Sequence, residues 1–526
     1  MEVHPRSPEI QGDGCWALAL LSLNSRRGYN AVLAAGGVIA VQRAMLYHGS
    51  CGKVQEHGCF AFSRLLSAAR FPGLCGPVGY TCIGCVVNAM SLHPLIEAVQ
   101  KYGCVILRNV SYCEQGRAVV KGRGGIDAIV GAMRENMQHS AMRVVACDAL
   151  CNVAHTDTNR MEVGDVGGVE MILAAITYDT ECIDVFEHGC NALQTVALLE
   201  VNRRSIVRLG GVELVLRVMA QHTASTCVQL HGCMVLGNLA RASCPASRDR
   251  LCMMQDVGIM AVLQAMQDHP FHTGLQLHAC TAINNLGCFL GGRDDNTTVV
   301  EVVLQAMETH ASDVGLQLQA CAVIEKLARM MMQDITVDLR QRISTTVVAA
   351  MQAHLRHVQF CELGCRLFRT LAYYSHAGNQ IMAACGVEVI VAAMREHIEA
   401  RDVQQYGFGV LGGLSKTRGH MTTVVQKGGL VAVMAGMRAH IADADALVCG
   451  LCCLQDFMLN VENRLAVVDA GGADLVLEVL YAHNENPSVL SVGSAIIEIC
   501  QPDYIQPGET RVVGGQGLRR RRGVQM

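Results

Sequence analysis

The chain has 526 residues, of which 51% are hydrophobic, 17% charged and 4% aromatic, and its formal net charge at pH 7 is −4. This composition excludes a wholly disordered protein, which needs low hydrophobicity and high net charge. It also lacks the net basic balance that a nucleic-acid-binding protein usually carries. We therefore expect a folded chain, a core of small and aliphatic side chains, and no nucleic-acid partner.

The N-terminal segment, residues 1–10, has no basic region followed by a long apolar stretch, so we expect a flexible start and no signal peptide. Long uncharged runs occur at 71–96, 218–240 and 269–292, but polar or helix-breaking residues interrupt each of them. No membrane span is therefore predicted. The 26 cysteines are interpreted as reduced thiols. The expected location is the cytoplasm, with the nucleus as a further site.

Two short motifs recur along the chain at a nearly constant interval. The first is a small residue followed by methionine, found at Ala44–Met45, Ala89–Met90, Ala132–Met133, Ala265–Met266, Ala306–Met307, Ala350–Met351, Ala393–Met394 and Gly436–Met437. The second is a small residue followed by cysteine, found at Gly14–Cys15, Gly58–Cys59, Gly103–Cys104, Ala146–Cys147, Gly189–Cys190, Gly232–Cys233, Ala279–Cys280, Ala320–Cys321 and Gly364–Cys365. From Cys15 to the equivalent Ser494 the period is about 43.5 residues, which is typical of helical solenoids.

Within each period the apolar spacing is helical. In the stretch 210–222, Val212, Val215, Val218 and Met219 fall on one helix face. A second helix follows at 228–240, and a Gly-Gly pair separates a shorter apolar segment from the middle helix. The predicted unit is a short helix, a glycine turn, a middle helix, a loop and a long third helix.

In chain order, the sequence begins in a third helix at 12–23 and then runs through eleven units. Two units deviate, because proline and glycine at 70–84 predict an irregular loop and Pro245 marks a loop insertion at 242–250. The Pro- and Gly-rich residues 501–526 predict a disordered tail.

The Gly-Gly-Val turn, the Ala-Met helix and segments such as 232–240 resemble the armadillo repeat, over nearly the whole chain. The resemblance extends to the armadillo region of leucine-rich-repeat kinases and to protist armadillo chains, although no kinase signature is present. It implies an all-α, right-handed superhelical solenoid over residues 11–500, with about eleven complete three-helix repeats and a leading third helix.

Cysteine and histidine are interpreted mainly as structural residues. One cysteine per helical layer cannot pair with the next, because stacked helices are ~8–10 Å apart and a disulfide needs Cα atoms roughly 4.4–6.8 Å apart. Nine histidines stand three residues after the methionine position, where we expect them to end second helices: His48, His93, His222, His269, His310, His354, His397, His440 and His483. A zinc site at Cys82 and Cys85, with Cys75 and His93, is conceivable but loosely spaced. We predict no metal, no cofactor and no enzymatic activity.

Asparagine gives the strongest functional hint. Five residues after the cysteine position stand Asn109, Asn152, Asn238 and Asn285, with Arg108 and Asn284 beside two of them. The resemblance implies that third helices line a groove where such amides hydrogen-bond the backbone of a bound peptide. The alternative is that each asparagine satisfies backbone groups of the neighbouring repeat.

The predicted function is a non-enzymatic scaffold that binds an extended or helical segment of a partner protein in this groove. One alternative is the regulatory region of a larger signalling enzyme. Another is a nuclear-transport adaptor that uses the basic cluster Arg519, Arg520, Arg521 and Arg522. The apolar N-terminal helix also suggests end-to-end self-association at that edge, since solenoid ends normally carry a polar cap.

Overall fold

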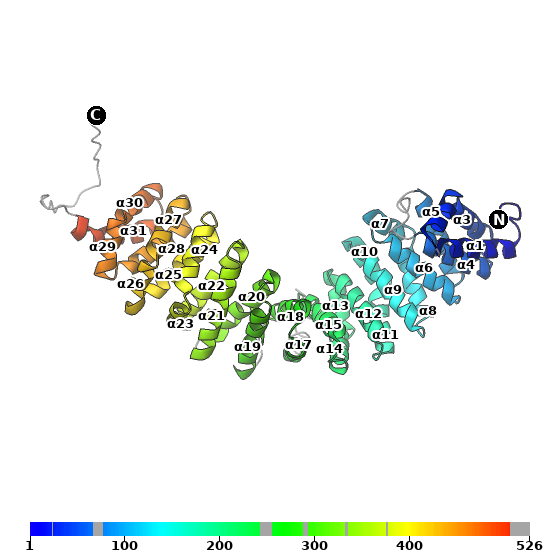
Figure 1. The fold of residues 1–526 in the computed structure, drawn as a ribbon, viewed down its shortest axis with the longest axis horizontal. Coiled ribbons are helices and arrows are strands. Elements are labelled where there is room, and N and C mark those ends of the chain that lie inside the picture. The colour runs from blue at the N-terminus through cyan, green and yellow to red at the C-terminus, as the bar shows by residue number, and fades with distance from the viewer. Residues whose placement is uncertain are drawn as a thin grey trace, which may run out of the picture. The chain divides into compact units, whose positions relative to one another are not determined.

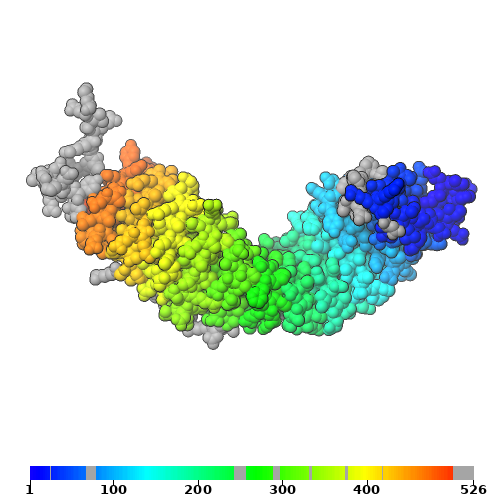
Figure 2. All heavy atoms as spheres, viewed as in Figure 1, coloured from blue at the N-terminus to red at the C-terminus, as the bar shows by residue number. Residues whose placement is uncertain are grey.

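The computed structural model describes residues 1–23, 25–66, 77–241, 255–287, 293–331, 335–374 and 377–504, and every regular element in these ranges is a helix. The chain divides into two compact units, Met1–His310 and Ala311–Met526. Figure 1 shows the helices, and Figure 2 shows the first unit from blue to green and the second from green to red.

In the first unit, the helices that carry the small-residue–cysteine motif are called third helices. They are α1 (Pro8–Leu23), α4 (Gly52–Leu65), α6 (Glu97–Val110), α9 (Ser140–Val153), α12 (Ile183–Val196), α15 (Thr226–Leu239) and α18 (Thr273–Leu286). The second helices are α3 (Gly37–Tyr47), α5 (Pro77–Leu92), α8 (Gly125–Glu135), α11 (Gly168–Tyr178), α14 (Gly211–Gln221), α17 (Gln255–Asp268) and α19 (Arg293–Thr309). The described first helices are α2 (Arg26–Ala34), α7 (Glu114–Gly122), α10 (Asp157–Asp165) and α13 (Glu200–Arg208).

The second unit repeats this arrangement. Its third helices are α20 (Val314–Met331), α22 (Val358–Tyr374), α25 (Arg401–Ser415), α28 (Ala444–Phe457) and α31 (Pro487–Tyr504). Its second helices are α21 (Val337–Ala353), α24 (Gly386–Glu396), α27 (Gly429–Ala439) and α30 (Gly472–Ala482), and its first helices are α23 (Gly378–Ala383), α26 (Arg418–Gln426) and α29 (Val461–Asp469).

Within each unit, consecutive third helices pack side by side and form an unbroken row. The row runs α1, α4, α6, α9, α12, α15, α18 in the first unit and α20, α22, α25, α28, α31 in the second. Each repeat therefore packs mainly on its neighbours, which is the arrangement of a helical solenoid. The predicted all-α solenoid is confirmed.

The Gly-Gly pairs end the first helices as predicted, and the two glycines have different roles. Gly124 adopts a left-handed backbone with φ 72°, which L residues with a side chain rarely adopt. At Gly125 a Cβ would stand 2.8 Å from the Val120 carbonyl oxygen, so the second position needs glycine for close packing. In one repeat Cys385 takes the first position with φ 62°, the one non-glycine residue with positive φ among the described residues.

The two recurring motifs pack against each other. A Cβ at Gly232 would stand 2.4 Å from Sδ of Met219, and the same close approach joins Gly103 to Met90. The nine cysteines of the second motif have no exposed surface and carry free thiols, which confirms their interpretation as core residues: Cys15, Cys59, Cys104, Cys147, Cys190, Cys233, Cys280, Cys321 and Cys365.

The nine histidines after the methionine position follow second helices, as predicted, and also join successive repeats. Each donates from Nε2 to a backbone carbonyl of the preceding repeat at 2.7–2.9 Å, as His222 does to Thr180. We call these contacts the histidine links. Sequence reasoning placed the histidines correctly but did not identify their acceptors, which lie some 43 residues away.

The N-terminal segment, predicted to be flexible, instead reproduces part of a repeat. The side chain of Met1 lies against Gly14 as Met45 lies against Gly58. Gln11 donates to the carbonyls of Met1 and His4, just as Gln55 donates to those of Met45 and His48. The residues before α1 therefore occupy the place of the last turn of a second helix.

Three details differ from the sequence predictions. The predicted loop at 70–84 is wrong for residues 77–84, because Pro77 starts α5, a position where proline is well tolerated. Helix α19 has 17 residues, where the second helix α14 has 11. Helix α31 continues to Tyr504, four residues into the predicted tail. The rest of that tail and the 242–250 insertion lie outside the described residues.

No single described helix has both the length and the apolar composition of a membrane span. Helices α2 and α3 reach these criteria only when taken together, with a bend of 64° between them.

Candidate functional site

The asparagine row lies on third helices of the first unit, half-exposed, as predicted. Its amides are already engaged, however. Asn285 donates from Nδ2 to the Gly237 carbonyl at 3.0 Å, and Asn238 donates to the Gln194 carbonyl at 3.2 Å. Asn152 makes a longer contact of 3.4 Å to the Arg108 carbonyl. Each of these acceptors belongs to the neighbouring repeat. The alternative interpretation, in which an asparagine satisfies backbone groups of that repeat, therefore applies to Asn152, Asn238 and Asn285.

The row is also interrupted and uneven. Asn109 accepts from Nε and Nη2 of Arg108 at 3.4 Å, and Thr195 takes the equivalent position on α12 between Asn152 and Asn238. Asn284 lies beside Asn285 on α18 and is half-exposed. The remaining amide oxygens and protons of the row could still contact a ligand, because an amide offers two donors and an acceptor.

Three charged side chains, one on each of three consecutive third helices, contact one another beside the asparagine row. Arg108 on α6 lies 3.1 Å from Oδ2 of Asp148 on α9, and His188 on α12 lies 2.6 Å from Oδ1 of the same carboxylate. Burial raises the pKa of Asp148, but the hydrogen bonds and charges of His188 and Arg108 outweigh burial and lower it. The hydrogen bond that His188 donates to the Asp148 carboxylate raises the pKa of His188. These contacts therefore favour the ionised carboxylate of Asp148 and the protonated imidazole of His188.

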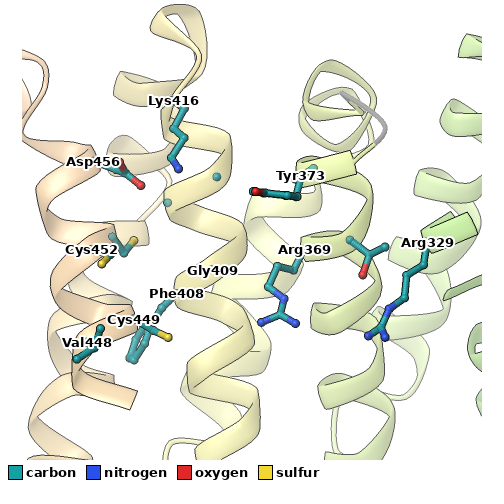
Figure 3. A pocket seen from close by; sticks show the side chains of 15 residues that line it. Arg329, Arg369, Tyr373, Phe408, Gly409, Lys416, Val448, Cys449, Cys452 and Asp456 are labelled. Atoms are coloured by element: carbon teal, nitrogen blue, oxygen red, sulfur yellow. The ribbon is translucent and has the colours of Figure 1, made fainter. Parts of the chain in front are cut away.

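The second unit contains a groove that sequence reasoning missed. Gly409, Gly412 and Gly413 lie on one face of α25, and at the positions of Gly409 and Gly413 the other third helices carry side chains. A hollow of about 720 Å³ lies beside this face, between α22 and α28 (Figure 3). Arg369 lies against Gly409, and Cys453 and Asp456 of α28 lie against Gly412. A Cβ at Gly413 would meet only the Cβ of Ala372, at 3.9 Å, so this part of the groove is open. We call this hollow the α25 groove.

Cations stand at the edges of the α25 groove. Arg369 of α22 lies over the Tyr406 ring, with Cζ 4.7 Å from its centroid, and its Cδ would be 2.8 Å from a Cβ at Gly409. Lys416 follows the end of α25, and Arg329 of α20 completes the set (Figure 3). Among the described residues, neither Arg369 nor Lys416 lies within ion-pair distance of a carboxylate, whereas Arg329 pairs with Glu325.

The opposite side of the groove is formed by α28, with Cys449, Cys452 and Asp456. Burial raises the pKa of Asp456, with a smaller opposing effect from Lys416, and burial also raises the pKa of the Cys452 thiol. The Cys452 thiol is therefore a poor nucleophile, and the groove combines apolar and thiol surface with three cations and one carboxylate. This composition suits binding rather than covalent chemistry.

The three glycines at 409, 412 and 413 were the sequence signal for this groove, since they are spaced to share one helix face. The basic cluster Arg519–Arg522 and Cys75 lie outside the described residues. Within the ranges that the structure covers, no three or more His, Cys, Asp or Glu side chains gather where they could hold a metal ion. Cys82 and Cys85 are buried within α5.

Comparison with known proteins supports the fold. No family model and no curated protein matches the chain. Among solved structures, an engineered protein aligns with a TM-score of 0.66 and 18% identity, over 80% of this chain and 98% of that one. A chain from a study of a phosphorylation switch in the interaction between cadherin and beta-catenin aligns with a TM-score of 0.64 and 14% identity, over 84% and 86% of the two chains.

These similarities, together with the rows of third helices, define the class of protein: a helical-repeat solenoid. At such low identity the similarity concerns the fold, and the function has to be argued from the surface of the third helices.

Proposed function

We propose that the protein is a non-enzymatic scaffold that binds a segment of a partner protein along its third helices. The observation that carries this proposal is the α25 groove, a hollow on a row of third helices beside two cations, Arg369 and Lys416, that lie outside ion-pair distance of the carboxylates among the described residues. The solved structure from the cadherin and beta-catenin study, which concerns an interaction between proteins, agrees with this class of function.

The first unit contributes a second surface to the same function. Its half-exposed asparagines and the Arg108–Asp148–His188 chain present donors and acceptors across adjacent repeats. Because three of the four asparagines also join repeats, their loss lowers stability as well as binding. A test has to separate these two effects.

The test is affinity capture followed by mass spectrometry with the full chain and two variants. In the first variant Asn109, Asn152, Asn238 and Asn285 become alanine. In the control, His222→Ala and His269→Ala remove two histidine links, which lowers stability away from the third-helix surface. We expect the asparagine variant and the control to have similar melting temperatures. The asparagine variant should nevertheless lose specific partners that the control retains. Retention of every partner by the asparagine variant would refute a role for this row.

The regulatory region of a larger signalling enzyme and the nuclear-transport adaptor stay as alternatives to a free scaffold. For the adaptor, deletion of Arg519–Arg522 should abolish nuclear accumulation of a fluorescent fusion, while the same deletion should leave partner capture by the solenoid intact. Unchanged nuclear accumulation contradicts the adaptor proposal.

A further inference from the structure

We propose that a second copy of this chain packs on α1, so that the two α1 helices form an antiparallel pair related by a twofold axis. Helix α1 is the first third helix in the row of the first unit (Figure 1). The interface is the side of α1 that faces away from α4, formed by Ile10, Ala17 and Leu21, which we call the α1 edge face. This inference goes beyond the proposed scaffold function, which a single copy can perform.

The α1 edge face corresponds to a surface that is buried in the third helices that follow. All three of its residues are exposed, and the exposed fraction of Leu21 reaches 58%. In α4 the equivalent residues Val54, Ala61 and Leu65 have no exposed surface. The same three positions have no exposed surface in α6, α9, α12 and α15. Helix α1 therefore presents to solvent an apolar side that other repeats bury.

A preceding third helix covers this side in the other repeats. A Cβ at Gly12 of α1 would stand 3.8 Å from Cγ2 of Val54 in α4, and one at Gly237 of α15 would stand 3.2 Å from Cα of Ala282 in α18. Val54 and Ala282 hold the positions of Ile10 and Ala17. The packing between repeats therefore indicates that a helix lying alongside α1 fits the α1 edge face.

The last third helix, α31, does not offer a matching apolar side. Ser491 and Glu498 hold the positions of Gly12 and Gly237, which face the following third helix, and both are exposed. Packing of the α1 edge face on α31 would bury the Glu498 carboxylate against apolar side chains, which is unfavourable. A second α1 edge face offers an apolar surface instead. Two identical surfaces that meet in this way form a closed dimer with twofold symmetry.

The charges at the ends of α1 set the direction of the pair. Arg26 and Arg27 follow its last turn and are exposed. In a parallel pair these arginines of both copies would meet and repel one another. An antiparallel pair separates them by the length of the 16-residue helix, about 24 Å. It also brings them toward Arg6 and Glu9 of the second copy, of which Glu9 attracts them.

The middle of the face is suited to close packing. Ala17 lies between the larger Ile10 and Leu21, so the two backbones can approach at the centre. Asp13, which borders the face, already forms an ion pair with Lys53 of α4 at 3.0 Å. The pairing therefore does not require this carboxylate to be buried without a partner.

The first experiment measures the mass of the full chain by sedimentation equilibrium at increasing micromolar concentration. We expect a species of about 113 kDa, twice the mass of the 56.6 kDa chain. Leu21→Asp places a charge in the α1 edge face and should raise the dissociation constant of the dimer by at least about tenfold. Val201→Asp is the matched control, because Val201 of α13 is exposed to a similar extent, 60%, and lies outside the face.

The second experiment tests the direction by cross-linking. Chains with Ile10→Cys and chains with Leu21→Cys are treated with a short bis-maleimide, separately and mixed, and the linked peptides are identified by mass spectrometry. An antiparallel pair brings position 10 of one copy toward position 21 of the other, so this link should form in the mixture. A link between two copies of position 10, or between two copies of position 21, would overturn the antiparallel arrangement.

A chain that keeps a mass of 56.6 kDa at every concentration overturns the proposal, and so does equal dimerisation of Leu21→Asp and wild type. Leu477→Asp provides a further check, because Leu477 of α30 is 45% exposed at the other end of the series of repeats. Loss of association in this variant, or growth beyond a dimer, would assign the contact to head-to-tail stacking and overturn the twofold pair. None of these measurements involves a partner protein, so their outcome is independent of the scaffold function.

Discussion

His222 donates from Nε2 to the carbonyl oxygen of Thr180 at 2.8 Å, and so ties the end of one second helix to the loop that follows the previous second helix. The acceptor is a carbonyl, so Nε2 must carry the proton. The same contact recurs at all nine histidines of this position, which makes it a regular part of the interface between repeats.

Substitution of His222 by alanine should lower the free energy of unfolding by about 1 kcal/mol, the typical net value of one hydrogen bond. Urea denaturation monitored by circular dichroism measures the change. Gln221→Ala, at the exposed neighbouring position, serves as the control and should alter stability little. Equal transitions for the two variants would show that the histidine links contribute nothing measurable.

Replacement of Cys385 by glycine should stabilise the protein by about 1 kcal/mol, because the left-handed backbone at φ 62° costs a residue with a Cβ roughly 1–2 kcal/mol, while glycine loses some chain entropy on folding. The side chain is exposed, so little packing is lost. Thermal unfolding compares the variant with wild type. The reverse change, Gly471→Ala at φ 78° in open space, should destabilise by a similar amount.

The Asp148–His188 pair should make stability depend on pH. The pKa of His188 is raised above 6.5 in the folded state, so its contribution is full below about 6.5 and is lost as pH rises through the folded pKa. The pKa of Asp148 is lowered below 3.8, so its contribution is present above about 4 and is lost as pH falls through the folded pKa. Both groups therefore contribute between these limits.

His188→Gln should consequently cost more stability near pH 5.5 than near pH 8.5, in urea titrations at the two values. His48→Gln is a suitable comparison because its partner is a neutral carbonyl rather than a carboxylate. A loss for His188→Gln that is the same at both pH values would contradict the charged pair.

Thiol labelling should follow burial. Burial raises the pKa of Cys147 to about 12 and that of Cys233 to about 12, and both side chains have no exposed surface. Cys227 and Cys385 are exposed. A maleimide should therefore modify the exposed thiols in the native protein and the buried ones only in denaturant, as read by peptide mass spectrometry. Native labelling of Cys147 would show that the repeats open locally.

Much of the fold could be predicted because its signals are local. Gly124 and Gly125 end a helix through their own backbone requirements, and His222 follows the last turn of its helix wherever the repeat stands. The acceptor of each histidine and the place of Met1 could not be predicted in the same way, because they depend on which loop or residue of another layer lies alongside.

The candidate site also has features that local sequence predicts and features that depend on neighbouring repeats. The asparagines were found from their position in the repeat, but that position alone does not show that Asn285 is already bonded to Gly237. The α25 groove is open at Gly413, where a side chain is missing, while Arg369 lies against Gly409 and Asp456 lies against Gly412. Such a hollow becomes visible only when adjacent helices are placed beside each other.

The row of third helices has a mechanical consequence. Since each repeat is held mainly by the next, a pulling force applied within either unit would detach one repeat before it loads the following one. Stretched in an optical trap, each unit should lengthen in a series of small, similar steps rather than in one abrupt rupture.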